Sequence, residues 1–278
     1  MNKKLLSLHN LKFNPFAQDL PTDALWVGPA LESFCWRIEQ QVGEGGFALV
    51  IGEPGSGKSA SLRTLCARLS RLREVTVGIL TRPQAGLADF YRELGEIFGV
   101  ALRPHNRYAS AKVLRDKWHK HVENSLCRPV LLIDEAQESG GPVLSELRLL
   151  ASADLDSRSI LTIVLAGDSR LAAKLETPEL LPLASRVRTR LRTEALSPQQ
   201  LAECLGHVLK VAGNPKLMTT ALVQTLCEHA AGNLRLLMHM SFDLLAAACE
   251  QEIEQIDEKL YFQVFAVDPK PASKRRVA

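Results

Sequence analysis

The sequence predicts an α/β fold with a mainly parallel sheet flanked by helices and followed by a small helical domain. Three observations support this prediction: short continuous apolar runs, helical apolar spacings between them, and a purely helical pattern after Pro198. A continuous apolar run is typical of a strand that is buried on both faces of a parallel sheet. Strands that alternate with helices therefore indicate an α/β domain.

The expected elements follow one another along the chain. The first apolar run covers residues 47–51 and ends at Gly52, which marks the end of a strand. Further strands are expected over residues 75–80, 129–133, 160–166 and 187–193. Apolar residues at helical spacing predict helices from Pro29 to Gly43 and over residues 59–73, 87–98, 110–124, 143–153 and 170–174. After a boundary near residue 196, helices are expected over residues 199–212, 219–230, 234–251 and 258–265.

Composition places the chain among ordinary globular proteins. Of its 278 residues, 46% are hydrophobic and 23% are charged, which disfavours disorder, collagen or a coiled coil. The longest apolar stretches, such as residues 160–167, are much shorter than the roughly 18 to 20 residues that cross a bilayer. The first residues include two lysines, but His9, Asn10 and Lys12 interrupt any signal-like apolar region. We therefore expect a cytoplasmic protein with no membrane partner.

Charge and cysteine content exclude further classes of protein. The formal charge of +3 is too small to indicate a nucleic-acid partner by itself. The six cysteines include no CxxC pair and no histidine at ligand spacing, so we expect reduced, buried thiols and neither a disulfide framework nor a structural metal.

A glycine-rich segment follows the first predicted strand. Residues 52–59 read GEPGSGKS and fit the pattern GxxxxGK[ST] between a predicted strand and a predicted helix. In such a loop, backbone N–H groups turn toward phosphate oxygens and the helix N-terminus adds positive potential. Lys58 would reach the β and γ phosphates of a nucleotide, and Ser59 would bind Mg²⁺. The alternative interpretation is a chance glycine turn.

Two acidic residues, Asp134 and Glu135, end the apolar run at residues 130–133. Asp134 is expected to bind Mg²⁺ largely through water, and Glu135 is expected to activate the attacking water. The alternative is that the pair caps the next helix. Because Glu135 supplies a base, the sequence favours ATP hydrolysis over simple nucleotide binding or a kinase reaction.

Three more positions are candidates for contact with phosphate. Asp168 follows the strand at residues 160–166 and is placed either to contact the γ phosphate or to serve as a helix N-cap. Every second residue from 186 to 192 is arginine, and these side chains share one face of a strand. Arg186 is the candidate arginine finger for the ATP of a neighbouring subunit, while a charged edge that prevents strand pairing is the alternative for the row. Arg235 begins a helix, where either a phosphate or a surface ion pair would compensate its charge.

The order of these motifs resembles that of the AAA+ ATPases. More closely, about residues 11–250 are similar to the ExeA-type branch of that family. This branch includes the cytosolic domain of the secretion ATPase ExeA and the transposition helper ATPases of the TniB, TnsC and phage Mu B type. The segments that carry the resemblance are FNPF (13–16), LIDEAQ (132–137), LSELRLL (144–150), VLAG (164–167) and GNLR (232–235).

The resemblance implies a role for each motif. Asp134 and Glu135 correspond to Walker B, with Mg²⁺ held by Asp134 and Ser59. Asp168 corresponds to sensor 1, where the family more often has Gln, Asn or Thr, while Arg186 corresponds to the finger and Arg235 to sensor 2. Phe16 and Val27 would line the adenine pocket, although periodicity alone assigns them to the core. The Walker A residues implied to bind ATP are Gly52, Glu53, Pro54, Gly55, Ser56, Gly57, Lys58, Ser59 and Ala60.

The motifs and the shifts in composition divide the chain into four parts. A lead-in segment over residues 1–40 is expected to pack near the nucleotide site. The P-loop α/β domain covers residues 41–196, a helical lid domain covers residues 197–266, and a basic tail over residues 267–278 is expected to be disordered.

Residues 103–128 are locally basic, with seven Lys or Arg against two acidic residues. Phosphate backbones attract such a patch without sequence readout. By resemblance to the helper ATPases, Arg103, Arg107 and Lys112 are the candidate DNA contacts, and a solvated helix face is the alternative. In the tail, candidates for contact with a transposase or DNA are Lys270, Lys274, Arg275 and Arg276.

These inferences predict an ATP-hydrolysing, DNA-binding AAA+ protein that forms a ring or a helical filament on double-stranded DNA, with ATP between subunits. It would select target sites and recruit or stimulate a separate transposase. The resemblance to the secretion ATPase covers only the cytosolic part of that protein, which favours the helper. Two alternatives stay open: a secretion-type assembly ATPase without DNA affinity, and a nucleotide switch with slow hydrolysis.

Overall fold

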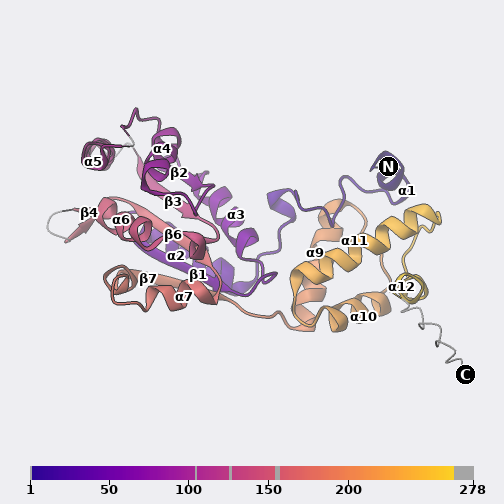
Figure 1. The fold of residues 1–278 in the computed structure, drawn as a ribbon. Helices are drawn as coiled ribbons and strands as arrows, with labels where there is room; N and C mark the ends of the chain where they lie inside the picture. Colours follow the sequence, from indigo (N-terminus) through magenta and orange to yellow (C-terminus); the bar gives the residue numbers. More distant parts are fainter. Residues whose placement is uncertain (1, 104, 125–126, 154–156, 266–278) are drawn as a thin grey trace, which may run out of the picture. The chain divides into compact units, whose positions relative to one another are not determined.

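The computed structural model describes residues 2–103, 105–124, 127–153 and 157–265. They form two compact units (Figure 1). An α/β unit covers residues 27–195, and a helical unit combines the described residues before position 27 with those after position 195. The basic tail residues singled out above, Lys270, Lys274, Arg275 and Arg276, lie outside the described residues.

The α/β unit is built on a five-stranded parallel sheet with the strand order β2-β3-β6-β1-β7. The central strands are the continuous apolar runs and are buried almost throughout, whereas the edge strand β7 alternates between buried and exposed residues. The sheet therefore confirms the predicted fold class. Its strands are β1 (Gly46–Gly52), β2 (Val75–Leu80), β3 (Arg128–Ile133), β6 (Thr162–Gly167) and β7 (Val187–Thr193).

Helices cover both faces of this sheet (Figure 1). The core of one face contains Val50, Leu132 and Val164, and it is covered by α2 (Pro29–Gln41) and α3 (Lys58–Leu69). The core of the opposite face contains Phe47 and Leu131. The helices of that face are α4 (Leu87–Phe98), α5 (Arg107–Glu123), α6 (Gly141–Ala151), α7 (Ser169–Leu175) and α8 (Leu181–Ala184).

Two helices of the α/β unit end earlier than the sequence predicts. The pattern predicts a helix over residues 59–73, but α3 ends at Leu69. The apolar pattern predicts a helix to residue 153, but α6 ends at Ala151. The next two residues form β4 (Ser152–Ala153), which pairs with β5 (Arg158–Ser159) in a short antiparallel ladder. Pairing with a partner outside the helix thus overrides the local helical periodicity.

The helical unit has a core of its own, in which Leu205, Leu222 and Leu244 are fully buried. Local signals define its first long helix, because Ser197 and Gln200 form a capping box and Gly213 ends the helix in the left-handed conformation. The helices are α1 (Asn2–Leu8), α9 (Pro198–Ala212), α10 (Thr220–Ala230), α11 (Leu234–Glu250) and α12 (Glu258–Phe265). None of the described helices of the chain combines the length and the apolar character needed to cross a bilayer.

The N-terminal residues belong to this helical unit. Leu5, Leu11 and Phe16 are buried in its core, and the Lys12 N–H donates to the carbonyl oxygen of Ala212 at 2.8 Å. The sequence predicts a single lead-in segment over residues 1–40. In the structure this stretch divides, because its described residues before position 27 pack with the helical unit whereas α2 packs on the sheet. These contacts join residues far apart in sequence, so no local periodicity reports them.

The six cysteines are free thiols, and Cys35, Cys204, Cys227 and Cys249 are buried. Burial raises the pKa of Cys35 to about 11 and that of Cys204 to about 12. Because the thiolate is the reactive form, we expect a thiol reagent at pH 8 to modify the partly exposed Cys66 and Cys127 first. Mass spectrometry of the native protein would check this order. Equal labelling rates for buried and exposed thiols would contradict this prediction. As a control, all six cysteines should be labelled in denaturant.

Candidate nucleotide site

The loop between β1 and α3 forms the first half of the candidate site. Gly55 and Gly57 have φ angles of 86° and 95°, which glycine adopts without strain. Gly57 is also the N-cap of α3, and no side chain caps the amide groups of the first turn. These N–H groups stay available to an anion, with the positive end of the helix dipole behind them. The donor set fits the phosphate chain of a nucleotide.

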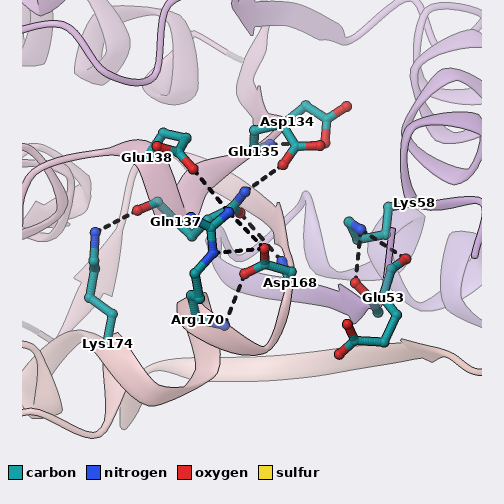
Figure 2. A network of polar contacts seen from close by, with 10 residues as sticks. Glu53, Lys58, Asp134, Glu135, Gln137, Glu138, Asp168, Arg170 and Lys174 are labelled. Carbon is teal, nitrogen blue, oxygen red and sulfur yellow. Dashed lines mark hydrogen bonds and ion pairs between the residues drawn. The ribbon is translucent and has the colours of Figure 1, made fainter. Parts of the chain in front are cut away.

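Lys58 is the first residue of α3, and its side chain turns back across the loop. It is 6% exposed, and Nζ donates to the carbonyl oxygens of Gly52 at 2.8 Å and Glu53 at 3.2 Å (Figure 2). The ammonium group is therefore held inside the loop by two carbonyl groups. Ser59 follows on the exposed side of the same turn.

Contacts with the end of β7 hold the loop against the sheet. The hydroxyl groups of Ser56 and Thr193 share a hydrogen bond of 2.6 Å. A Cβ atom at Gly52 would collide with the Thr193 hydroxyl and would lie 2.6 Å from the Thr193 carbonyl oxygen. The first glycine of the motif is thus required by the close approach of β7 to β1.

Asp134 and Glu135 follow β3 and reach the same edge of the sheet as the loop. Only β6 separates β3 from β1, and parallel strands present their carboxyl ends at one edge, where α/β folds bind ligands. Asp134 Oδ1 accepts a hydrogen bond of 2.9 Å from the Glu135 N–H. Glu135 is exposed and has a φ of 50°, a conformation that is uncommon for a non-glycine residue.

Asp168 acts as the N-cap of α7, and its carboxylate is paired with Arg170. Oδ1 accepts from the Arg170 backbone N–H at 2.9 Å, and Oδ2 accepts from Nε at 2.9 Å and Nη2 at 2.8 Å (Figure 2). The side-chain bond from Arg170 lowers the pKa of Asp168. The structure therefore supports the N-cap alternative as its local role. It also adds Arg170, which the sequence analysis did not single out.

Gln137 is the second residue that the sequence analysis missed, and it lies between the two acidic strand ends. Its Nε2 donates to Glu135 Oε2, and its Oε1 accepts from the Asp168 N–H at 3.3 Å (Figure 2). The side chain is only 5% exposed. The segment LIDEAQ contains this residue, but only the short 3-10 turn η2 (Ala136–Glu138) aims the amide back at Glu135.

Comparison with known proteins agrees with this geometry. Residues 40–175 match the AAA domain family. These residues form an AAA domain. Among solved structures, Cdc6p from Pyrobaculum aerophilum aligns with a TM-score of 0.69 at 14% identity, covering 87% of this chain and 67% of that one. At this identity the likeness shows the fold alone, which is the AAA+ P-loop fold with a C-terminal helical region.

Two relatives extend beyond the AAA domain. General secretion pathway protein A of Aeromonas hydrophila is 32% identical over 197 residues, which cover 69% of this chain and 35% of that protein. ATP-dependent target DNA activator B of Escherichia phage Mu is 26% identical over 224 residues, which cover 78% of this chain and 65% of that protein. The chain thus matches about a third of the first relative and less than two thirds of the second. Both branches named in the predicted resemblance are confirmed as relatives.

The arginine row lies just beyond the residues matched to the AAA domain. Arg188, Arg190 and Arg192 are exposed on one face of β7, while Thr189 and Leu191 are buried on the other. Arg188 Nη1 is 2.6 Å from Glu44 Oε2. Arg186 precedes the strand, is partly buried and donates through Nη1 to the Pro182 carbonyl oxygen. Its role as a finger stays a prediction.

The remaining predicted nucleotide contacts divide between the two units. Val27 begins the α/β unit, whereas Phe16 lies in the core of the helical unit. Arg235 is exposed in the first turn of α11, and Asn233 caps that helix by accepting from the Leu236 N–H at 3.1 Å. The predicted adenine pocket and sensor 2 therefore stay predictions.

The basic segment that contains α5 uses several of its charges internally. Arg107 forms an ion pair with the buried Glu146, Arg115 donates to the Ser152 carbonyl oxygen at 2.7 Å, and Lys117 donates to the Phe98 carbonyl oxygen. Arg103 and Lys112 are exposed. Of the three candidate DNA contacts, Arg107 thus has a structural partner, while the other two face solvent.

Proposed function

We propose that this protein is an ATP hydrolase that binds double-stranded DNA in its ATP state. The observation that carries the proposal is the convergence of the glycine loop, Lys58, Asp134 and Glu135 at one edge of the AAA domain sheet. The DNA partner is supported by the similarity to the ATP-dependent target DNA activator B of phage Mu. On this basis the protein acts as a transposition helper that recruits or stimulates a separate transposase.

In the proposed reaction, the loop amides and Lys58 bind the phosphates of ATP, and Ser59 and Asp134 hold Mg²⁺. The metal ion, when bound, neutralises charge on the phosphate oxygens. Glu135 is an exposed carboxylate at the end of β3, and it accepts the proton of the attacking water. Hydrolysis then acts as the timer that releases DNA.

Four further roles rest on the motif order. Arg186 would act on ATP held by the neighbouring subunit of a ring or filament, Arg235 would contact phosphate from the helical unit, and Phe16 and Val27 would contact the base. Asp168 would sense the γ phosphate through the network that it shares with Arg170.

Arg103 and Lys112 would contact the DNA backbone, since both are exposed and basic.

A second candidate function is an assembly ATPase of a secretion system without DNA affinity. The similarity to General secretion pathway protein A, at 32% identity, favours it. Both candidates share the ATPase chemistry and differ only in the partner, so DNA binding separates them.

The deciding experiment measures DNA affinity with ATP, ADP or a non-hydrolysable ATP analogue over a range of salt concentrations. We expect tight, salt-sensitive binding only with ATP or the analogue, and rings or filaments by electron microscopy. Lys58→Ala should abolish the nucleotide dependence. Replacing Arg103 and Lys112 by alanine should reduce the salt slope by about one for each DNA phosphate that the variant no longer neutralises. The exposed Lys216 of the helical unit supplies the matched control, Lys216→Ala. Equal weak binding in every nucleotide state would favour the secretion-type alternative.

A further inference from the structure

The Gln137 amide joins two strand ends of the candidate site. Its Nε2 donates to Glu135 Oε2, and its Oε1 accepts from the Asp168 backbone N–H at 3.3 Å (Figure 2). The partners determine which end of the amide points which way, because a carboxylate accepts hydrogen bonds and a backbone N–H donates them. Reversal of the amide would break both bonds. The side chain therefore connects the end of β3 to the end of β6 in one defined orientation.

Close packing holds this amide in place. The Gln137 side chain is 5% exposed, and a Cβ atom at Gly167 would lie only 2.5 Å from Oε1. The glycine at the end of β6 thus makes the space that the amide oxygen occupies. A residue with any side chain at position 167 would displace the amide.

Helix α7 holds the turn that carries Gln137. Lys174 Nζ donates to the carbonyl oxygen of Gln137 at 2.6 Å (Figure 2). It also donates to the carbonyl oxygen of Ser139 at 2.9 Å. Arg170 Nη2 lies 3.0 Å from Glu138 Oε1 and also pairs with Asp168. Two backbone carbonyl groups near the turn and the Glu138 side chain are therefore bonded to α7, which holds the turn that carries the amide against that helix.

Glu135 itself has little else to fix its carboxylate. It is exposed, and among the described residues the Gln137 amide is the side chain that donates a hydrogen bond to it. The bond occupies Oε2 and leaves Oε1 to accept a proton from water. A general base that is fixed in this way loses less orientational freedom when it reacts.

We propose that Gln137 is a positioning residue that fixes the Glu135 carboxylate for activation of water and ties it to β6 and α7. This inference rests on the proposed ATPase function and deepens it. Gln137 itself transfers no proton. Its role is to orient the carboxylate that does.

Two substitutions test the proposal in the full-length protein, with phosphate release and the binding of a fluorescent ATP analogue as readouts. Gln137→Leu has a similar volume but removes both hydrogen bonds. We expect kcat to fall about tenfold or more, because a hydrogen bond to a charged group is removed, while nucleotide affinity and KM stay near those of the wild type. Gln224→Leu makes the same replacement at an exposed glutamine of α10, so it is the matched control and should retain the wild-type kcat.

The second substitution, Gln137→Glu, gives a signature that a purely structural role would not produce. Near neutral pH the introduced carboxylate repels Glu135 and cannot donate to it. As the pH falls, the introduced group gains a proton, and its O–H replaces the amide N–H as a donor. We therefore expect the kcat of this variant, relative to wild type, to rise as the pH is lowered from 8 to 6.

Each outcome has a distinct meaning. A Gln137→Leu variant that keeps the wild-type kcat, or a Gln137→Glu variant whose pH profile parallels the wild type, would overturn the positioning role. Wild-type protein that binds the analogue but releases no phosphate would overturn the proposed ATPase function before any variant is compared. If Gln137→Leu fails to bind the analogue, the pH profile of Gln137→Glu decides.

Discussion

Replacement of Glu135 by glutamine is expected to lower ATP turnover by about 10²- to 10⁴-fold while nucleotide still binds. The substitution removes the carboxylate that, on the proposed function, accepts a proton from water, but it keeps the size of the side chain. Its amide oxygen can still accept from Gln137 Nε2, so the connection between β3 and β6 is retained. Lys58 and the loop amides are unchanged, and on the proposed function they carry the phosphate contacts.

Phosphate release and the binding of a fluorescent ATP analogue would be measured on the same preparation. Glu96→Gln is the matched control, because it makes the same replacement at an exposed glutamate of α4. Turnover within a few-fold of wild type in Glu135→Gln would exclude Glu135 as the base. On the proposed function, ATP hydrolysis releases the protein from DNA, so the variant should also stay on DNA longer.

Replacement of Glu146 by alanine is expected to destabilise the α/β unit by about 3 kcal/mol. The Glu146 side chain is 3% exposed, accepts a hydrogen bond from the Tyr91 hydroxyl and forms an ion pair with Arg107. Tyr91 is fully buried, and burial together with this hydrogen bond raises the pKa of its phenol, so the group is a neutral donor. Alanine would leave that hydroxyl without an acceptor and open a cavity between α4, α5 and α6. The loss of the ion pair with Arg107 contributes less to the destabilisation, since the Arg107 side chain is 55% exposed and water can solvate it.

Urea unfolding would measure this loss of stability, with the buried Trp118 of α5 as a fluorescent reporter of the α/β unit. Glu146→Gln keeps an acceptor for Tyr91 and should cost less than the alanine substitution. The exposed pair of Asp89 and Arg92 supplies a second control, and Asp89→Ala should change stability by less than about 1 kcal/mol. If Glu146→Ala and Asp89→Ala lower the free energy of unfolding equally, the buried pair contributes no more stability than the exposed pair.

The Glu146 prediction also bears on the basic segment. Arg107 was a candidate DNA contact because it lies in the locally basic segment and by resemblance to the helper ATPases, but a carboxylate buried on α6 pairs with it. A sequence pattern shows which residues of a segment are charged, but not which of them form ion pairs in the fold. Arg103 and Lys112 are therefore the better positions at which to test DNA contact.

By itself, the sequence determined the elements whose signals are local. The continuous apolar runs of β1, β3 and β6, the glycines and lysine of the phosphate loop, and the acids that end β3 are all read from neighbouring residues. Burial on both sheet faces and the geometry of a helix N-terminus act over a few residues, so a short pattern is enough to predict them.

Tertiary structure alone decided which distant residues meet. It brought Gln137 to the backbone N–H of Asp168, paired Arg107 with Glu146, and packed Leu5, Leu11 and Phe16 into the helical unit. Each of these contacts depends on the order of strands in the sheet or on the docking of helices. That order is a property of the whole hydrophobic core, which no local period of apolar residues encodes.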